Sequence, residues 1–179
     1  MLDVLLKRFE APDDVRKMEK GRFELVPTIT LAEGARPVTD DKSTEHSRLI
    51  DARPSRVFDA FRDPLKLARW WGPNGFSSTF ETFDFREGGK WKFVLHAPDG
   101  KDYPNLNEFV EIVPDRRVRL HHVEGHWFEL TMELATEGTG TRVRWRQEFA
   151  NAAEYDAVKE YVIPANEQNL DRLEAVVKQ

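Results

Sequence analysis

The sequence contains no cysteine, which excludes disulfides, thiolate catalysis and zinc–thiolate sites and suits a reducing cytosol. It has no long basic block, and its formal net charge is −5. Nucleic acid is therefore not expected as a partner, and an anionic membrane surface is disfavoured for the same reason. No apolar run reaches transmembrane length, and the opening residues are too early-charged for a secretory signal. We expect a cytoplasmic protein that does not insert into a membrane.

Sequence signatures of several common enzyme classes are missing as well. There is no Gly-x-Ser-x-Gly elbow, no phosphate-binding loop and no dinucleotide fingerprint. The Ser77-Ser78 pair lies in a strand-like segment without a recognisable base beside it. We therefore predict no catalytic nucleophile and no cofactor.

The 179 residues fit one domain, and 33% charged residues indicate a well-solvated surface. Residues 1–44 differ from the rest. They combine helical signals at 3–9 and 12–19, strand-like stretches at 23–26 and 28–31, and a polar segment at 33–44. We predict an N-terminal extension and linker at 1–44 and one domain at 45–179.

The most informative segment is residues 69–76, where Trp70 and Trp71 directly precede Gly72-Pro73. Adjacent residues on a helix point about 100° apart, so the two indoles cannot pack on one helical face. At least one must cover a sheet, a neighbouring helix or the mouth of a cavity. We favour a role as wedges between helix and sheet, and a cavity position for Trp71 stays open.

Two short helices are predicted before this corner. Pro54 suits a first helical position, and Val57, Phe58 and Phe61 form one apolar face behind it. Asp63-Pro64 then restarts the helix, with Asp63 as its cap.

A short strand is predicted at 47–52, and residues 76–149 alternate as antiparallel strands do, with one of these strands at 107–113. Alternation is strictest at 128–134 and 143–149, which indicates a sheet with one apolar and one solvated face. A parity change near Glu81-Thr82 predicts a bulge. The outer glutamates of the last hairpin are expected to lie against its outer arginines.

The last element is a long C-terminal helix. Asn151 and Glu154 have the spacing of a capping box, and Pro164 should kink or restart the helix. An apolar stripe continues through Leu170 and Leu173. The predicted class is α+β, with about six or seven antiparallel strands that the helix covers.

This order resembles the helix-grip or START-like (SRPBCC) superfamily, and more closely its family of activators of heat-shock-protein ATPase homologues (AHSA type). The residues that carry the resemblance span roughly 46–177: the run IDARPSRVFDAF at 50–61, Asp63-Pro64, Trp70-Trp71-Gly72-Pro73, Gly88-Gly89-Lys90-Trp91 and Asp171-Arg172-Leu173. The resemblance implies a curved sheet wrapped around the helix, with a pocket for apolar or aromatic molecules between them. Superfamily members include carriers, receptors, cyclases and co-chaperone domains, so the fold does not settle the function.

The inward-facing positions supply a candidate ligand-binding set. His122 and Gln147 are its polar members, and each needs a neighbour, water or a ligand once buried. The full set comprises Trp71, Trp91, Phe93, Leu120, His122, Leu130, Met132, Trp145, Gln147 and Phe149.

Metal and acid–base chemistry have weaker support. His121 and His122 point to opposite faces of a strand, and only His126 and Glu124 could join His122 across a turn, so we predict no metal site. Asp84, Glu108 and His122 are the titratable candidates for proton transfer, yet their spacing shows no paired carboxylates, and no catalytic residue is assigned.

Three functional hypotheses follow. The first is noncatalytic binding of a small hydrophobic or aromatic molecule in a cavity between sheet and helix. The second is a cyclase- or hydratase-like enzyme that uses the same pocket. The third, ranked lowest because a full co-chaperone activator carries a further large domain, is a chaperone-partner module. A homodimer is left open.

Overall fold

The computed structural model describes residues 42–179. The helical and strand-like signals predicted within residues 1–41 lie outside this range. Ten elements follow one another within it: β1 (Ser43–Ile50), α2 (Pro54–Arg62), α3 (Pro64–Trp70), β2 (Ser77–Phe83), β3 (Lys90–His96), β4 (Asp102–Val113), β5 (Arg117–His122), β6 (Phe128–Glu137), β7 (Gly140–Phe149) and α4 (Ala152–Val177).

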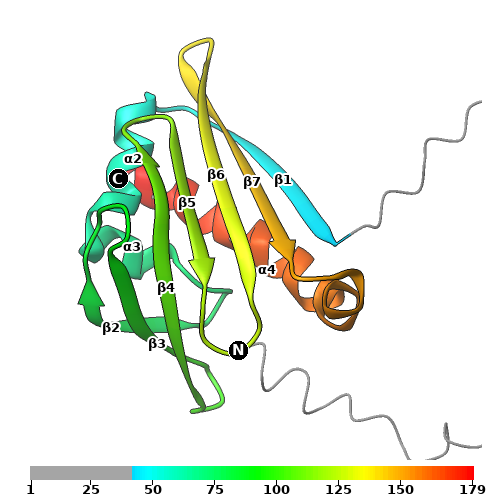
Figure 1. The fold of residues 1–179 in the computed structure, drawn as a ribbon. Helices are drawn as coiled ribbons and strands as arrows, with labels where there is room; N and C mark the ends of the chain where they lie inside the picture. The colour runs from blue at the N-terminus through cyan, green and yellow to red at the C-terminus, as the bar shows by residue number, and fades with distance from the viewer. Residues whose placement is uncertain (1–41) are drawn as a thin grey trace, which may run out of the picture.

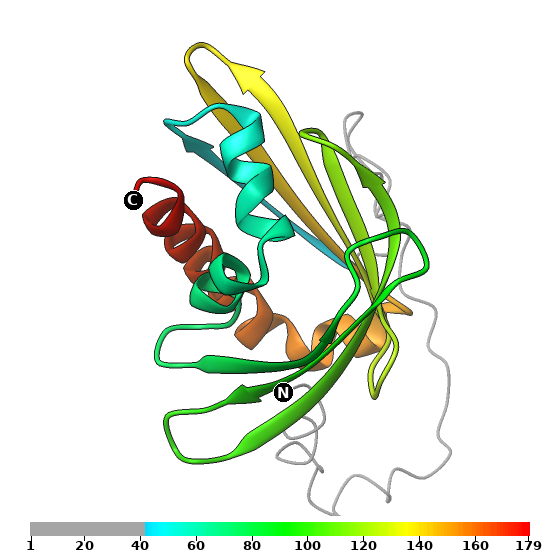
Figure 2. The ribbon, with the colours of Figure 1, turned by 90° about the vertical axis from the view of Figure 1, so that its left-hand side faces the viewer.

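The strands form one antiparallel sheet in the order β1-β7-β6-β5-β4-β3-β2. The sheet is curved, and all three helices lie on its concave side (Figures 1 and 2). The predicted α+β helix-grip architecture is confirmed. Two strands begin earlier than predicted: β4 starts at Asp102 rather than at residue 107, and β1 starts at Ser43, inside the segment predicted as a linker.

One residue separates the two short helices, as the sequence predicts. Asp63 has extended backbone angles, which end α2, and its Oδ1 accepts a hydrogen bond of 2.9 Å from the Leu65 N–H. Pro54 and Pro64 occupy first-turn positions, where a missing N–H costs nothing. The chain therefore turns sharply between two helices of nine and seven residues.

The sheet contains the predicted bulge and one more. The β2–β3 register shifts between Phe80 and Thr82, as expected, and the β4–β5 register shifts between Phe109 and Glu111. Bulges increase local twist, which fits the strong curvature of this sheet.

The outer charges of the last hairpin follow the prediction in part. The register does set Glu133 of β6 opposite Arg144 of β7. The Glu133 carboxylate, however, pairs with Arg117 of β5 at 3.0 Å, and Glu129 pairs with Arg119 at 2.9 Å. Glu129 and Glu133 thus pair with the preceding strand, whereas Glu137, at the end of β6, pairs with Arg142 of β7 at 2.5 Å.

Helix α4 runs through Pro164 as a single element of 26 residues. Its axis bends between the orange N-terminal turns and the red C-terminal turns (Figure 2), a change of direction that a proline inside a helix explains. Asn151 caps its start, where Oδ1 accepts from the Glu154 N–H at 2.9 Å, as predicted. The face toward the sheet is apolar except for two buried asparagines, Asn166 and Asn169.

Candidate functional site

The two adjacent tryptophans have different surroundings. Trp70 is the last residue of α3, is fully buried, and donates its indole N–H to the Ala60 carbonyl at 2.8 Å. Trp71 has left the helix, with φ −72° and ψ 124°. Its indole meets that of Trp70 edge-on, at a centroid distance of 5.6 Å. Trp70 is therefore the wedge that the sequence predicts, whereas Trp71 lies on the wall of a pocket.

Helix α4 holds the turn that follows Trp71. The Gly72 N–H donates to Asn169 Oδ1 at 2.8 Å, and the Asn74 N–H donates to Gln168 Oε1 at 2.9 Å. The Arg172 guanidinium donates to the carbonyl oxygens of Gly72 and Pro73 at 2.6 and 2.8 Å. Gly72 needs its glycine because φ is +107° and a Cβ would lie 3.1 Å from the Leu95 side chain.

Two more carbonyl oxygens complete the surroundings of Arg172. Its guanidinium also donates to those of Arg69, at the end of α3, and Phe76, before β2, at 2.9 and 3.3 Å. Burial lowers the pKa of Arg172 from its ordinary value. The cation lies near a helix C-terminus, where exposed carbonyls favour positive charge. It therefore binds four main-chain oxygens around one corner of the fold.

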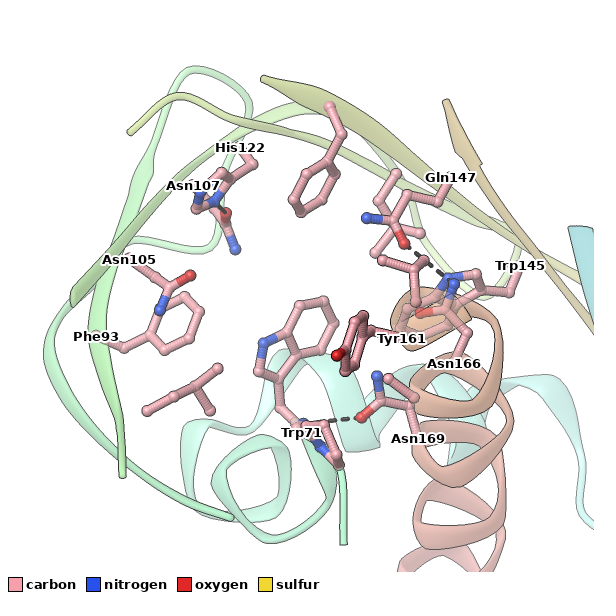
Figure 3. Close-up of a pocket in the computed structure, with 17 residues that line it drawn as sticks. Trp71, Phe93, Asn105, Asn107, His122, Trp145, Gln147, Tyr161, Asn166 and Asn169 are labelled. Carbon is pink, nitrogen blue, oxygen red and sulfur yellow. Dashed lines mark hydrogen bonds between the residues drawn. The ribbon is translucent and has the colours of Figure 1, made fainter. Parts of the chain in front are cut away.

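A pocket of about 90 Å³ lies between the concave face of the sheet and α4 (Figure 3). Its walls come from the turn after α3, from strands β3 to β7 and from α4. Tyr161 lines it and is 39% exposed, so the pocket reaches the surface at this residue. The lining residues are Trp71, Gly72, Pro73, Phe93, Leu95, Asn105, Asn107, His122, Phe128, Leu130, Trp145, Gln147, Tyr161, Val162, Ala165, Asn166 and Asn169.

Six of the ten residues chosen from the sequence line this pocket: Trp71, Phe93, His122, Leu130, Trp145 and Gln147. The other four, Trp91, Leu120, Met132 and Phe149, are buried in the hydrophobic core. Trp91 illustrates the difference, because it stacks on Phe93 at 4.3 Å and contacts Trp71 at 4.8 Å without itself lining the pocket. The inward parity of a strand residue predicts that its side chain is buried, but it does not distinguish a residue that lines the pocket from one in the hydrophobic core.

Sequence reasoning missed the four asparagines of the wall. Asn105 and Asn107 come from β4, and Asn166 and Asn169 from α4. Asn107 shares its strand parity with the buried Phe109, and Asn166 and Asn169 lie on the same apolar stripe as Leu170. A polar residue on an otherwise apolar inward face was the available signal. The remaining additions are Gly72, Pro73, Leu95, Phe128, Tyr161, Val162 and Ala165.

The buried polar side chains of the wall are paired with neighbours. Asn166 Nδ2 donates to Gln147 Oε1 at 3.1 Å, which joins α4 to β7. His122 Nδ1 lies 3.0 Å from Asn107 Oδ1, and its ring stacks on Phe128 at 4.8 Å with an interplanar angle of 9°. The expectation that burial would give His122 and Gln147 polar partners is confirmed.

Three buried donors of the described residues have no hydrogen-bond partner. They are Asn107 Nδ2, Trp145 Nε1 and Trp91 Nε1. Asn107 and Trp145 line the pocket, whereas Trp91 does not. An unpaired buried donor reduces the stability of the fold by about 1–3 kcal/mol, so each of the three requires a structural or functional explanation.

The structure does not assemble the other titratable candidates around His122. Asp84 pairs with Arg86 at 2.9 Å, Glu108 with Lys90 at 3.8 Å, and both carboxylates are more than 40% exposed. Within residues 42–179, no Asp, Glu, Lys or Arg side chain lines the pocket. His122 is thus the one proton-transfer candidate from the sequence that reaches the pocket.

Metal ligation has no cluster to support it. His121 points away from the pocket, where its Nε2 lies 2.9 Å from Glu129 and its ring meets Trp127 at 5.2 Å. Across residues 42–179 no group of three or more His, Asp or Glu side chains is placed to hold a metal ion. In the same range, no helix combines the length and the apolar character needed to cross a membrane.

Solved structures with the same fold are numerous. Protein CV1439 from Chromobacterium violaceum is 29% identical, with a TM-score of 0.70 over 77% of this chain and 98% of that one. Protein NE0264 from Nitrosomonas europaea is 20% identical, with a TM-score of 0.72 over 80% and 99%. The AHSA1-like protein from Aeromonas hydrophila is 21% identical, with a TM-score of 0.63 over 76% and 92%. The last two likenesses concern the fold alone.

No curated protein sequence matches this chain. A family model does, and it spans both short helices, the tryptophan corner, strands β2 to β7 and α4. Because the match to the model described as "Activator of Hsp90 ATPase homolog 1-like protein" covers residues 51–178, most of the sequence, the chain belongs to that family.

Proposed function

We propose that this domain binds a small apolar or aromatic molecule in the pocket beneath α4, without transforming it. The observation that carries the proposal is the composition of the wall. Among residues 42–179, no carboxylate or amine lines it, and its wall combines aliphatic residues with five aromatic side chains: Trp71, Phe93, Phe128, Trp145 and Tyr161. Apolar walls with a few placed polar groups are typical of small-molecule sites.

The size of the pocket limits the ligand. At about 90 Å³ it is smaller than the engineered cavity of about 150 Å³ that holds benzene. A ligand of about one ring fits this space if part of it extends toward the opening at Tyr161. Long fatty acids and sterols are expected to bind far more weakly, because most of their apolar surface would stay outside.

Tryptophan fluorescence tests the proposal directly, because Trp71 and Trp145 both line the pocket. Single-ring aromatic compounds should produce a saturable change in the emission of the wild-type protein. An Ala165→Phe variant, which fills the pocket from α4, should bind at least about tenfold more weakly, since a ligand and the new ring compete for the same volume. Trp127→Phe is the matched control, because Trp127 lies outside the pocket and is 39% exposed.

Two results would count against binding at this site. One is the absence of any saturable change with single-ring compounds in a folded wild-type protein. The other is binding by Ala165→Phe that equals the wild type, which would place the ligand elsewhere on the molecule.

The enzyme hypothesis has one supporting observation, the pair of His122 and Asn107. An amide oxygen that accepts from Nδ1–H fixes the orientation and tautomer of an imidazole, which is a requirement for proton transfer. If a pocket ligand is turned over, His122→Gln should reduce kcat by about 10²-fold or more. Unchanged turnover in that variant removes His122 from the chemistry.

The chaperone hypothesis stays a prediction. The large exposed apolar side chains within residues 42–179 are divided among several elements: Leu49 on β1, Leu65 on α3, Val123 and Trp127 beside the β5–β6 turn, and Tyr161 and Ile163 on α4. Stimulation of a chaperone ATPase by the purified protein would support it, and no stimulation would count against it.

A further inference from the structure

We propose that the pocket selects an uncharged single-ring compound that carries a hydrogen-bond-accepting oxygen, and that the side-chain amide of Asn107 binds this oxygen. The inference rests on the proposed function and adds the chemical class of the ligand. Among residues 42–179, the pocket wall contains a buried donor without a partner, in a lining made mostly of aromatic and aliphatic side chains.

Asn107 is one of the most completely buried polar residues of the described chain. It is 1% exposed and lines the pocket, and its Nδ2 has no hydrogen-bond partner among residues 42–179. In Figure 3 its amide nitrogen points into the space between the sheet and Trp71. A buried amide donor of this kind is stabilised when an acceptor enters the pocket, and an apolar ligand leaves it unpaired.

His122 decides which end of the amide faces the ligand. Asn107 Oδ1 lies 3.0 Å from His122 Nδ1, and a carbonyl oxygen can only accept, so Nδ1 carries the proton. The amide oxygen is thus occupied and the amide nitrogen is turned to the pocket. Stacking of the His122 ring on Phe128 holds the imidazole that sets this orientation.

The neighbouring polar groups do not compete for the same acceptor. Asn105 Nδ2 already donates to the Tyr103 carbonyl at 2.7 Å, and Asn166 and Gln147 bond to each other on the opposite side of the pocket (Figure 3). Trp145 has an unpaired indole N–H as well, but it also lies across the pocket from Asn107. Asn107 is therefore the unpaired donor at the end where His122 lies.

The electrostatics of the wall favour a neutral ligand. In the described part of the chain, none of the lining side chains is Asp, Glu, Lys or Arg. A carboxylate or an ammonium group would lose its hydration without gaining an opposite charge, and an unpaired charge is far more costly to bury than an amide or a carbonyl. A ketone, aldehyde, ester or amide oxygen meets the Asn107 donor without that cost.

The remaining wall provides a place for the ring. Trp71 lies 5.7 Å from Trp145 and 6.5 Å from Phe93, measured between ring centroids. Trp71 and Trp145 lie across the pocket from the His122–Asn107 pair, so a ring packed on them directs a substituent toward the amide (Figure 3). Ring and acceptor oxygen are thus recognised by different walls.

Acetophenone and α-methylstyrene test the inference as a matched pair, because they differ in having C=O or C=CH₂ at one position. Titration calorimetry should find acetophenone about 5- to 100-fold tighter for the wild-type protein, the range that one unpaired buried donor implies. Asn107→Leu should reduce this preference to within about twofold. Trp91→Phe removes an equally buried unpaired N–H outside the pocket and should leave the preference unchanged.

A spectroscopic measurement covers the case in which Asn107→Leu does not fold. In ¹⁵N-labelled wild-type protein, acetophenone should shift the side-chain NH₂ resonances of Asn107 downfield, and α-methylstyrene should not. The shift is expected for the hydrogen that donates to the ketone oxygen.

The outcomes separate this inference from the proposed function. Equal affinity for the two compounds, or an unchanged preference in a folded Asn107→Leu protein, overturns the role of Asn107 while binding in the pocket stands. If neither compound binds, both the ligand class and the proposed function are wrong. A clear preference that Asn107→Leu removes and Trp91→Phe keeps supports both.

Discussion

The Arg172 guanidinium on α4 donates a hydrogen bond of 2.6 Å to the Gly72 carbonyl, one residue beyond the tryptophan that lines the pocket. Residues 100 positions apart in the chain are joined there. Gly72 is in turn bound at its N–H by Asn169 of the same helix. Helix α4 therefore forms one pocket wall and also fixes the turn that presents Trp71 on another.

The four hydrogen bonds of Arg172 predict a large loss of stability when this residue is replaced by one of similar length that cannot donate them. Arg172→Met leaves four carbonyl oxygens without the cation, and we expect a loss of about 2–3 kcal/mol in the free energy of unfolding. Urea denaturation measures it. Arg62→Met is the matched control, because Arg62 is 64% exposed and forms a surface ion pair with Asp59, and it should cost under about 0.5 kcal/mol. Equal losses in the two variants would contradict the stabilising role of these Arg172 hydrogen bonds.

Substitution by alanine should reduce stability more at Gly89, in the turn before β3, than at Gly100, in the turn after it. A Cβ on Gly89 would lie 2.1 Å from the Asp84 carbonyl oxygen, a contact that backbone must move to relieve. Gly100 has φ +83°, but a Cβ there would meet nothing within 4 Å. We expect Gly89→Ala to cost about 3 kcal/mol or more and Gly100→Ala about 1–2 kcal/mol, as judged by thermal and urea unfolding. A larger loss for Gly100→Ala would show that the close approach at Gly89 is easily relieved.

Local signals predicted most of the fold. The pair Asp63-Pro64 is typical of a helix start, and α3 does begin there. The alternation in β6 and β7 predicts a sheet with one apolar face. The early start of β4 was missed because Pro104 and the polar residues around it lack strand character. That segment is a strand because residues 102–106 pair with residues 92–96 of β3, a cause that lies in strand pairing and not in the segment's own residue pattern.

The pocket was predictable only in outline. Parity identifies which side chains point inward, so His122, Trp145 and Gln147 were found. Whether an inward residue contacts another side chain or lines a cavity depends on the path of α4 across the sheet. That path could not be predicted, because Pro164 could either kink the helix or restart it. Asn107 and Asn166 were missed for this reason, since each becomes meaningful only through its contact with a distant residue.

The contact between β1 and α4 predicts a pH dependence of stability. The pKa of Glu167 is below its ordinary value of 4.5, because His46 donates a hydrogen bond of 2.6 Å to its carboxylate; burial opposes this and Arg48 adds to it. A carboxylate with a lowered pKa stabilises the fold above the ordinary value and loses that effect as pH falls through the folded value. Asp171 also pairs with Arg48.

The measurement is the urea midpoint of the wild type and of Glu167→Gln from pH 7 to pH 3. The wild type should be the more stable protein at pH 7, by a small margin because the pair is partly exposed. The difference should shrink below about pH 4.5, where the wild-type carboxylate gains a proton that Gln cannot take up. A difference that stays constant across this range would show that hydrogen bonding at Glu167 does not depend on its charge.

The buried hydrogen bond between Asn166 and Gln147 predicts that substitutions at these two residues have strongly coupled effects on the free energy of unfolding. Asn166→Leu removes the donor and leaves Gln147 Oε1 buried without it, so we expect a loss of about 1–3 kcal/mol, and Gln147→Leu should cost a similar amount. The double variant replaces both polar groups by apolar ones and should recover at least about 1 kcal/mol of the summed losses. Urea unfolding of the four proteins gives the coupling energy. Additive losses would mean that water or another group satisfies whichever partner is left, and that the two side chains contribute to the α4–β7 contact independently.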